Sequence, residues 1–242
     1  MSAPTALVVA GPGTNRDQDL VLALELAGAI ADVVLVHELA EQPERLRNAQ
    51  LVAIAGGFSY GDSLGAGRMM ALDLMTGVGD ELREFVASGR PVIGICNGFQ
   101  VLTRSKLLPG ALGHNVNGRF ECRWVVIDPQ PKSRCLWTNG LDEPIHCPIA
   151  HGEGRYVHPD PDTLGDAGQV ALRYRSTNPN GSVADIAGVC NASGNVFGLM
   201  PHPENFVLGR QHPHHLRGVR DAGLDNLGLA LFRNGVHAAA EM

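Results

Sequence analysis

Apolar and polar residues alternate in blocks over the first hundred positions of the chain. Apolar residues at helical spacing predict helices over 17–29 and 70–89, and the second of these ends at a glycine. Short unbroken apolar runs predict strands at 6–10, 32–39, 51–55 and 91–95. Apolar strands that alternate with helices indicate a parallel sheet with helices on both faces.

The pattern changes in the second half of the chain, where strands and hairpins replace the alternation with helices. We expect an Asn-Gly turn at 180–181 and a final helix over 224–236. The strands and hairpins are predicted at 119–128, 144–157, 169–175 and 188–204. The sequence shows no internal repeat, low-complexity tract or linker, so we expect one α/β domain over residues 1–242 with added antiparallel strands.

Three glycine-containing segments directly follow predicted strands. They are "GPGTNRD" (11–17), "GGFSYGDS" (56–63) and the turn that begins at Cys96. Chemistry in parallel α/β sheets gathers in loops beyond the carboxyl ends of the strands. We therefore expect the three segments to meet at one edge of the sheet.

Composition excludes several classes of function. Charged residues make up 18% of the chain, the net charge is −6, and no Lys/Arg run is present, which argues against a nucleic-acid-binding surface. The "GPGTN" segment lacks the lysine of a phosphate-binding P-loop, so nucleotide binding by this chain alone is disfavoured. With no basic signal-peptide region and no membrane-spanning apolar run, the sequence predicts a cytoplasmic protein without membrane contact.

Neither the cysteines nor the histidines form a metal-binding pattern. The five cysteines are odd in number, irregularly spaced and without a C-x-x-C pair, so they form no disulfide framework. A histidine-rich stretch contains His212, His214 and His215, but no cysteine or carboxylate lies at suitable spacing. We interpret this stretch as a solvated loop and expect no metal site.

The segment "GICNG", residues 94–98, has the G-x-C-x-G pattern of a nucleophile elbow. Cys96 could simply fill space in the core, because free cysteine is commonly buried. The preceding strand, the two glycines and the following helix favour a nucleophile, since a helix N-terminus stabilises a thiolate. The N–H of Asn97 could then point into an oxyanion hole.

His202 and Glu204, in "GLMPHPE", are the leading candidates for a general base and its orienting group. Residues two apart in extended chain share a face, so Glu204 can reach the imidazole nitrogen that does not face the cysteine. Taken alone, His-Pro-Glu is typical of a surface loop. The paired glycines of "GGFSYGD" could supply a second oxyanion N–H, with an ordinary tight loop as the alternative.

Several longer segments carry a resemblance to one family. They are "GGFSYGDSLGAG", "GICNGFQVLTRSKLLPGAL", "PIAHGEGRY", "NPNGSVADIAGVCNASGNVFGLMPHPE" and "LFRNGV". From about residue 7 to the last helix, the chain resembles the glutamine amidotransferase subunit of phosphoribosylformylglycinamidine synthase, an enzyme of purine biosynthesis. The elbow alone would indicate only the wider class I amidotransferases.

The resemblance implies a flavodoxin-like α/β fold in which a Cys-His-Glu triad hydrolyses L-glutamine to glutamate and ammonia. On this chain the triad is Cys96, His202 and Glu204. The ammonia would pass to a separate synthetase subunit, which uses ATP and Mg²⁺ to convert formylglycinamide ribonucleotide to the amidine. A small third subunit is also implied, and no cofactor is expected on this chain.

The resemblance also assigns residues around the triad. Gly57 and Asn97 would donate the hydrogen bonds of the oxyanion hole. The positions that match regions flanking the glutamine are Gln100, His151 and Gly152.

The chain departs from the family pattern in two places, and two other functions stay open. Relatives often have Tyr and Arg where this chain has Ser63 and Gly65, and the stretch 210–223 has no clear counterpart. One alternative function is a hydrolase or protease of the same fold that acts without a partner. The other is a catalytically silent module that regulates a synthetase, although an intact triad argues against it.

Overall fold

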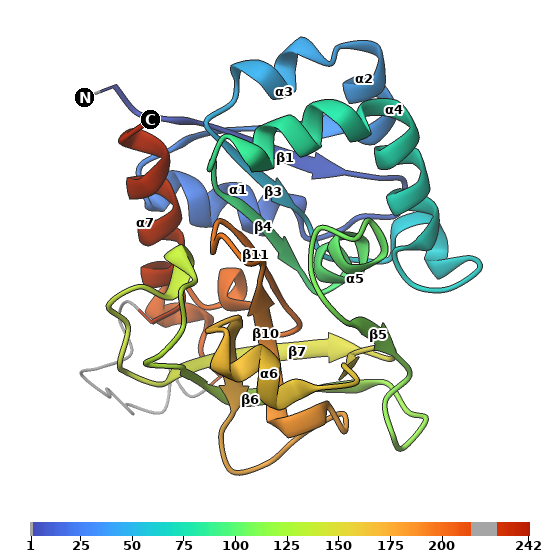
Figure 1. The fold of residues 1–242 in the computed structure, drawn as a ribbon, viewed down its shortest axis with the longest axis vertical. Helices are drawn as coiled ribbons and strands as arrows, with labels where there is room; N and C mark the ends of the chain where they lie inside the picture. Colours follow the sequence, from blue (N-terminus) through green and yellow to red (C-terminus); the bar gives the residue numbers. More distant parts are fainter. Residues whose placement is uncertain (1, 214–226) are drawn as a thin grey trace.

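The strands form one large sheet and one small sheet in the computed structural model, which describes residues 2–213 and 227–242. The strands of the large sheet are β1 (Thr5–Ala10), β2 (Ile30–Leu35), β3 (Leu51–Ile54), β4 (Val92–Ile95), β6 (Glu121–Pro129), β7 (Ile145–His151), β9 (Val170–Tyr174), β10 (Ile186–Cys190) and β11 (Val196–Leu199). Their order is β2-β1-β3-β4-β11-β10-β9-β6-β7 (Figure 1). The small sheet pairs β5 (Ala111–Gly113) with β8 (Arg155–Val157).

The large sheet has a parallel half and an antiparallel half. The neighbours from β2 to β11 are parallel, and those from β11 to β7 are antiparallel. The order β2-β1-β3-β4-β11 is the 2-1-3-4-5 order of flavodoxin-like folds. The predicted fold class, a mostly parallel sheet with antiparallel additions, is therefore confirmed. The single domain over 1–242 stays a prediction.

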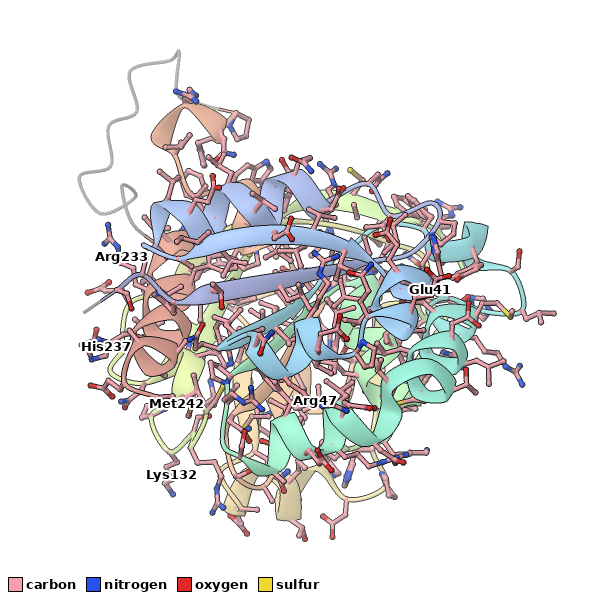
Figure 2. All side chains as sticks on the ribbon, turned by 90° about the horizontal axis from the view of Figure 1, so that it is seen from above. Glu41, Arg47, Lys132, Arg233, His237 and Met242 are labelled. Carbon is pink, nitrogen blue, oxygen red and sulfur yellow. The ribbon has the colours of Figure 1, made fainter. Side chains whose placement is uncertain are left out.

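Helices cover both faces of the parallel half. They are α1 (Asp17–Leu26), α2 (Val36–Glu41), α3 (Glu44–Asn48), α4 (Arg68–Ala87), α5 (Asn97–Arg104) and α7 (Leu227–Ala240). The short helix α6 (Pro161–Asp166) lies beside the antiparallel half (Figure 1). Helices α1 and α4 lie on opposite sides of the sheet (Figure 2), as right-handed crossovers require when the strand order reverses at β1. Helix α7 packs against α1, and both α2 and α3 pack against α4. Of the predicted final helix, residues 224–226 lie outside the described part.

The prediction of a strand over 32–39 is wrong in its second half. Strand β2 ends at Leu35, where its partner strand in the described part of the chain, β1, also ends at Ala10. Without a partner the apolar run continues as α2, and the Glu38 carboxylate accepts a hydrogen bond from the Leu35 N–H at 3.1 Å. A carboxylate in that position satisfies one of the free N–H groups at a helix start.

The predicted Asn-Gly hairpin turn is also different in the structure. Asn180 and Gly181 lie within a long connection between β9 and β10, and Asn180 is fully buried. Its side chain bonds to neighbouring segments, so this asparagine holds loops together instead of closing a two-residue turn.

The three glycine-containing segments meet at the carboxyl edge of the parallel strands, as predicted. Thr14 and Gly57 form an isolated β-bridge, and the Phe58 N–H donates to the Gly13 carbonyl at 3.3 Å. The Cys96 turn follows β4, which lies beside β3 in the sheet. This edge brings distant parts of the chain to one place.

Candidate active site

Cys96 occupies a sharp turn between β4 and α5. Its φ of 52° is in the left-handed region, which a non-glycine residue adopts only under strain. The Cys96 N–H donates to the Leu199 carbonyl of β11 at 2.8 Å, and its carbonyl accepts from the Gln100 N–H at 3.1 Å. The strand register and the first turn of α5 together hold the strained backbone in place.

The two glycines of the elbow are required by close backbone contacts. A Cβ at Gly98 would lie 2.1 Å from the carbonyl oxygen of Ile54, and a Cβ at Gly94 would lie 2.6 Å from the Gly98 carbonyl oxygen. A side chain at Gly98 would force α5 away from β3, and one at Gly94 would force β4 and α5 apart. The sequence pattern G-x-C-x-G therefore has a direct steric explanation.

His202 and Glu204 form a buried pair beside the cysteine. His202 Nδ1 donates to Glu204 Oε1 at 2.6 Å, and both side chains are buried. They lie at the start of the 3₁₀ helix η4 (Pro203–Asn205), which the His202 N–H anchors by donating to the Pro148 carbonyl of β7. Pro203 at the start of η4 also restricts the backbone.

The imidazole edge opposite Glu204 faces the cysteine. A Cβ at Gly56 would lie 3.0 Å from His202 Cε1 and 3.6 Å from Cys96 Cβ, so the ring and the cysteine flank the same glycine. Within the described residues, His202 Nε2 is buried without a hydrogen-bond partner. A buried nitrogen left open beside a thiol is available to exchange a proton.

The charge state of His202 is set by its neighbours. Burial alone lowers the pKa of His202, but the Glu204 carboxylate and the Cys96 sulfur outweigh burial and raise this pKa to about 10. The structure therefore favours an imidazolium between two groups that carry or acquire negative charge. This state can donate a proton to a leaving group.

Two backbone positions predicted for the oxyanion hole border the cysteine. Asn97 is the first residue of α5, where a backbone N–H has no acceptor inside the helix. Gly57 lines the same cavity as Cys96 and has a φ of 134°. A Cβ there would lie 2.6 Å from the Asn15 nitrogen, so this conformation and contact require glycine.

A small acidic cavity opens in front of Cys96. Its volume is about 170 Å³, below the roughly 300–1,000 Å³ of sites for drug-sized ligands. Asp62 and Glu153 place carboxyl groups in it, and burial and then the charge of Glu153 raise the pKa of Asp62. The lining residues are Gly57, Phe58, Asp62, Ala66, Cys96, Gln100, His114, Phe120, Ala150, His151, Gly152 and Glu153. The cavity fits a ligand the size of one amino acid with a positive group.

The residues predicted to flank glutamine all line this cavity, but two of them also hold other residues. Gln100 donates from Nε2 to the Glu153 carbonyl at 2.7 Å and accepts from Asn97 Nδ2 at 2.9 Å. His151 is buried with both ring nitrogens near asparagine side chains. Burial, followed by the charge of His202, lowers the pKa of His151 to about 4, so this ring is neutral.

Sequence reasoning missed the two acidic residues of the cavity. Asp62 stands in "GGFSYGDS", which follows the predicted strand 51–55, so its position after a strand is an available signal. Glu153 stands in "HGEG", inside the strand and hairpin segment predicted at 144–157, where its two glycines are the available signal. Ser59 was also missed; its hydroxyl bonds to Asn97 Oδ1 at 2.5 Å and supports the first turn of α5.

Gly65, where relatives often have Arg, lies next to an arginine from another part of the chain, Arg104. Gly65 has a φ of 109°, and a Cβ there would lie 3.2 Å from Arg104 Nη2. Arg104 reaches this loop from α5 and donates from Nε to the Ala66 carbonyl at 2.8 Å. The structure gives no explanation for Ser63.

Two predicted absences, of a metal site and of a membrane span, can be compared with the described residues. Within residues 2–213 and 227–242, no three His, Cys, Asp or Glu side chains gather as metal ligands. His212 packs against Trp124, with ring centroids 4.8 Å apart, whereas His214 and His215 lie outside the described residues. No helix in the described part is long and apolar enough to cross a bilayer.

Comparisons with known proteins place the chain in a family. The family model for the CobB/CobQ-like glutamine amidotransferase domain matches residues 3–237. Phosphoribosylformylglycinamidine synthase subunit PurQ of Treponema denticola is 48% identical, over 86% of this chain and 90% of the relative. The PurQ subunit of Dehalococcoides mccartyi is 39% identical over the full length of both chains.

A solved structure agrees with the sequence relatives. A chain in the structure of PurLQS from Thermotoga maritima is 37% identical, with a TM-score of 0.79 over 97% of this chain and 98% of that chain. The fold, the elbow cysteine beside a His–Glu pair, and these similarities agree. The chain therefore belongs to the PurQ family, the glutamine amidotransferase subunits of phosphoribosylformylglycinamidine synthase.

Proposed function

We propose that this chain hydrolyses L-glutamine at Cys96 and that His202 and Glu204 complete the catalytic triad. The observation that carries the proposal is the strained cysteine beside a buried imidazole whose Nδ1 lies 2.6 Å from a carboxylate. A nucleophile, a base and an orienting group in this arrangement define covalent amide hydrolysis.

The first half of the reaction forms a thioester. The Cys96 thiolate attacks the side-chain amide carbon of glutamine, and the carbonyl electron pair moves to oxygen, where the Gly57 and Asn97 N–H groups stabilise it. When the carbonyl re-forms, the C–N bond breaks, and the imidazolium of His202 donates its proton to the leaving nitrogen. Ammonia leaves, and the γ-glutamyl group remains on sulfur.

The second half releases glutamate. His202, now neutral, takes a proton from water while the water oxygen attacks the thioester carbon. The C–S bond then breaks, and the sulfur leaves as the thiolate beside the imidazolium. Glu204 holds the ring in one orientation through both steps and favours its charged form.

The cavity selects for a free amino acid. Its volume of about 170 Å³ accommodates one residue, and the carboxyl groups of Asp62 and Glu153 favour the positive α-ammonium group. In a peptide, the α-nitrogen is part of an amide bond and does not carry that positive charge. These features support L-glutamine and disfavour a protease.

The rim of the cavity supports docking of a synthetase over the site. Phe58 and Phe120 stack with ring centroids 6.2 Å apart and line the cavity, yet remain 43% and 51% exposed. Exposed aromatic side chains at a cavity mouth are typical of an interaction surface. In our proposal the synthetase covers this rim, receives the ammonia and supplies the ATP and Mg²⁺ sites, a small third subunit joins the complex, and this chain binds no cofactor.

The test is ammonia release from glutamine by the chain alone and with its synthetase partner. Cys96→Ala is expected to lower the rate by about 10⁴-fold or more, because the nucleophile is lost. Cys122→Ala, at a cysteine that is exposed and does not line the cavity, is the matched control and should match the wild type.

Two further measurements decide between the possible functions. The Cys96→Ala complex supplied with ammonium should still form the amidine, because the synthetase step does not need the thiol. Equal glutamine hydrolysis by Cys96→Ala and the wild type would show that the cysteine only fills space. Partner-independent cleavage of peptides by the wild type would instead support a protease.

A further inference from the structure

Segment 151–154 ("HGEG") forms one wall of the cavity. Gly152 and Glu153 line the space in front of Cys96, and the neighbouring Ala150 carbonyl lies 3.7 Å from Cys96 Sγ. His151 is the last residue of β7, and residues 152–154 then link β7 to β8 without belonging to a strand. The position of residues 152–154 must therefore come from contacts with neighbouring segments.

Asn115 binds both ends of this segment. Its Oδ1 accepts from the Gly154 N–H at 3.1 Å and from His151 Nδ1 at 3.2 Å, while its Nδ2 donates to the His151 carbonyl at 2.9 Å. Its backbone N–H donates to the Gly152 carbonyl at 2.9 Å. One buried side chain therefore sets the separation of the two ends of the loop.

Asn180 binds the segment from the other side. Its Nδ2 donates to the Gly154 carbonyl at 2.8 Å and lies 3.4 Å from His151 Nε2. Its Oδ1 accepts from the Ser182 hydroxyl at 2.7 Å, which fixes the orientation of the amide. Asn180 is completely buried, so its polar atoms have no access to bulk water.

The imidazole of His151 lies between the two asparagines. A Cβ at Gly154 would lie 2.2 Å from His151 Nδ1, so the loop is folded directly against the ring. Asn115 Oδ1 fixes the proton on Nδ1, which leaves Nε2 to accept from Asn180. Amide partners on both sides suit the neutral ring.

We infer that Asn115 and Asn180 are positioning residues that set the shape of the glutamine cavity through His151 and the 151–154 backbone. The inference rests on the proposed function. Neither asparagine is among the described residues that line the cavity, so each acts through the wall and not by touching glutamine. Displacing a wall by about 1 Å can cost a reaction roughly a hundredfold, because the substrate is misplaced.

The test distinguishes a change in the cavity wall from a change in the reactivity of Cys96. In Asn115→Ala and in Asn180→Ala, we expect kcat/KM for glutamine to fall by about tenfold to a hundredfold, mainly through KM. Inactivation by a chloromethyl ketone analogue of glutamine should slow in parallel. Alkylation of Cys96 by iodoacetamide, which needs the thiolate but not the shaped cavity, should keep its wild-type rate.

Asn117→Ala is the matched control, because Asn117 lies in the same loop as Asn115 but is exposed. It should retain the wild-type KM. Two variants keep the test decisive if one fails to fold, and thermal unfolding of each identifies such a failure. A wild-type KM in a folded Asn115→Ala or Asn180→Ala would overturn the inference, as would an equal loss of iodoacetamide labelling. Absence of glutamine turnover in the wild type would instead contradict the proposed function.

Discussion

Two buried histidines in one site have opposite properties. His202 and His151 are each 3% exposed. The pKa of His202 is raised to about 10, although burial opposes its charge, because the Glu204 carboxylate and the Cys96 sulfur stabilise the imidazolium. The pKa of His151 is lowered to about 4, by burial and by the charge of His202, and its ring nitrogens meet only amide groups.

The difference shows that, at equal burial, the partners of a histidine decide its chemical role. A carboxylate partner makes a ring that can carry and release a proton during catalysis. Amide partners make a neutral ring that serves as a rigid support with a fixed tautomer. Changing one partner at a time should exchange these properties.

Glu204→Gln should have the largest effect, because it gives His202 an amide partner of nearly the same shape. The pKa of His202 should fall, and the imidazolium should no longer be favoured before the attack. We expect kcat for glutamine hydrolysis to fall between about 10²- and 10⁴-fold, the range for loss of a general acid–base function. Steady-state ammonia release checks this, and an unchanged kcat would remove Glu204 from the triad.

Asn115→Asp makes the converse change, because it places a carboxylate at the oxygen position 3.2 Å from His151 Nδ1. The pKa of His151 should rise by about 1–3 units, as for other ionisable groups beside an opposite charge. NMR titration of the His151 ring measures the shift, and Asn117→Asp is the control in the same loop. A His151 pKa that stays near 4 would show that burial and the charge of His202 set it regardless of the partner at position 115.

The pH dependence of stability should show the smallest effect. For His151 the folded pKa lies below the unfolded value, so its contribution is present above pH 6.5 and is lost as the pH falls towards 4. This loss amounts to about 2 kcal/mol between roughly pH 7 and pH 5. For His202 the folded pKa is raised, so its contribution is present below pH 6.5 and is lost as the pH rises through about 10.

Denaturant unfolding at a series of pH values measures both contributions. His151→Gln should flatten the acid side of the profile, and Glu204→Gln should flatten the alkaline side. If His151→Gln leaves the acid side unchanged, other groups control stability there.

The parallel half of the fold and the elbow at Cys96 could be predicted because their signals are local. Apolar runs mark β1, β3 and β4 to within a residue or two, and the G-x-C-x-G pattern marks the elbow directly. Strand β2 was predicted too long, because the end of an edge strand depends on where its neighbour stops. That information is absent from the run itself.

The roles of the two asparagines could not be predicted, because their bonds join segments far apart in the chain. Asn115 and His151 are 36 positions apart, and Asn180 and His151 are 29 apart. The Asn-Gly pair at 180–181 suggested a turn, since an asparagine before glycine favours one. Only the packing shows that its amide is buried beneath the cavity wall.

The place of β11 in the sheet determines when the turn at Cys96 gains its support. Strand β11 is inserted between β4 and β10, and its Leu199 carbonyl accepts the hydrogen bond from the Cys96 N–H. A nascent chain that ends before this strand contains the cysteine but lacks the support of its turn, and it also lacks His202 and Glu204. The proposed site is therefore assembled only after the ribosome has made most of the polypeptide.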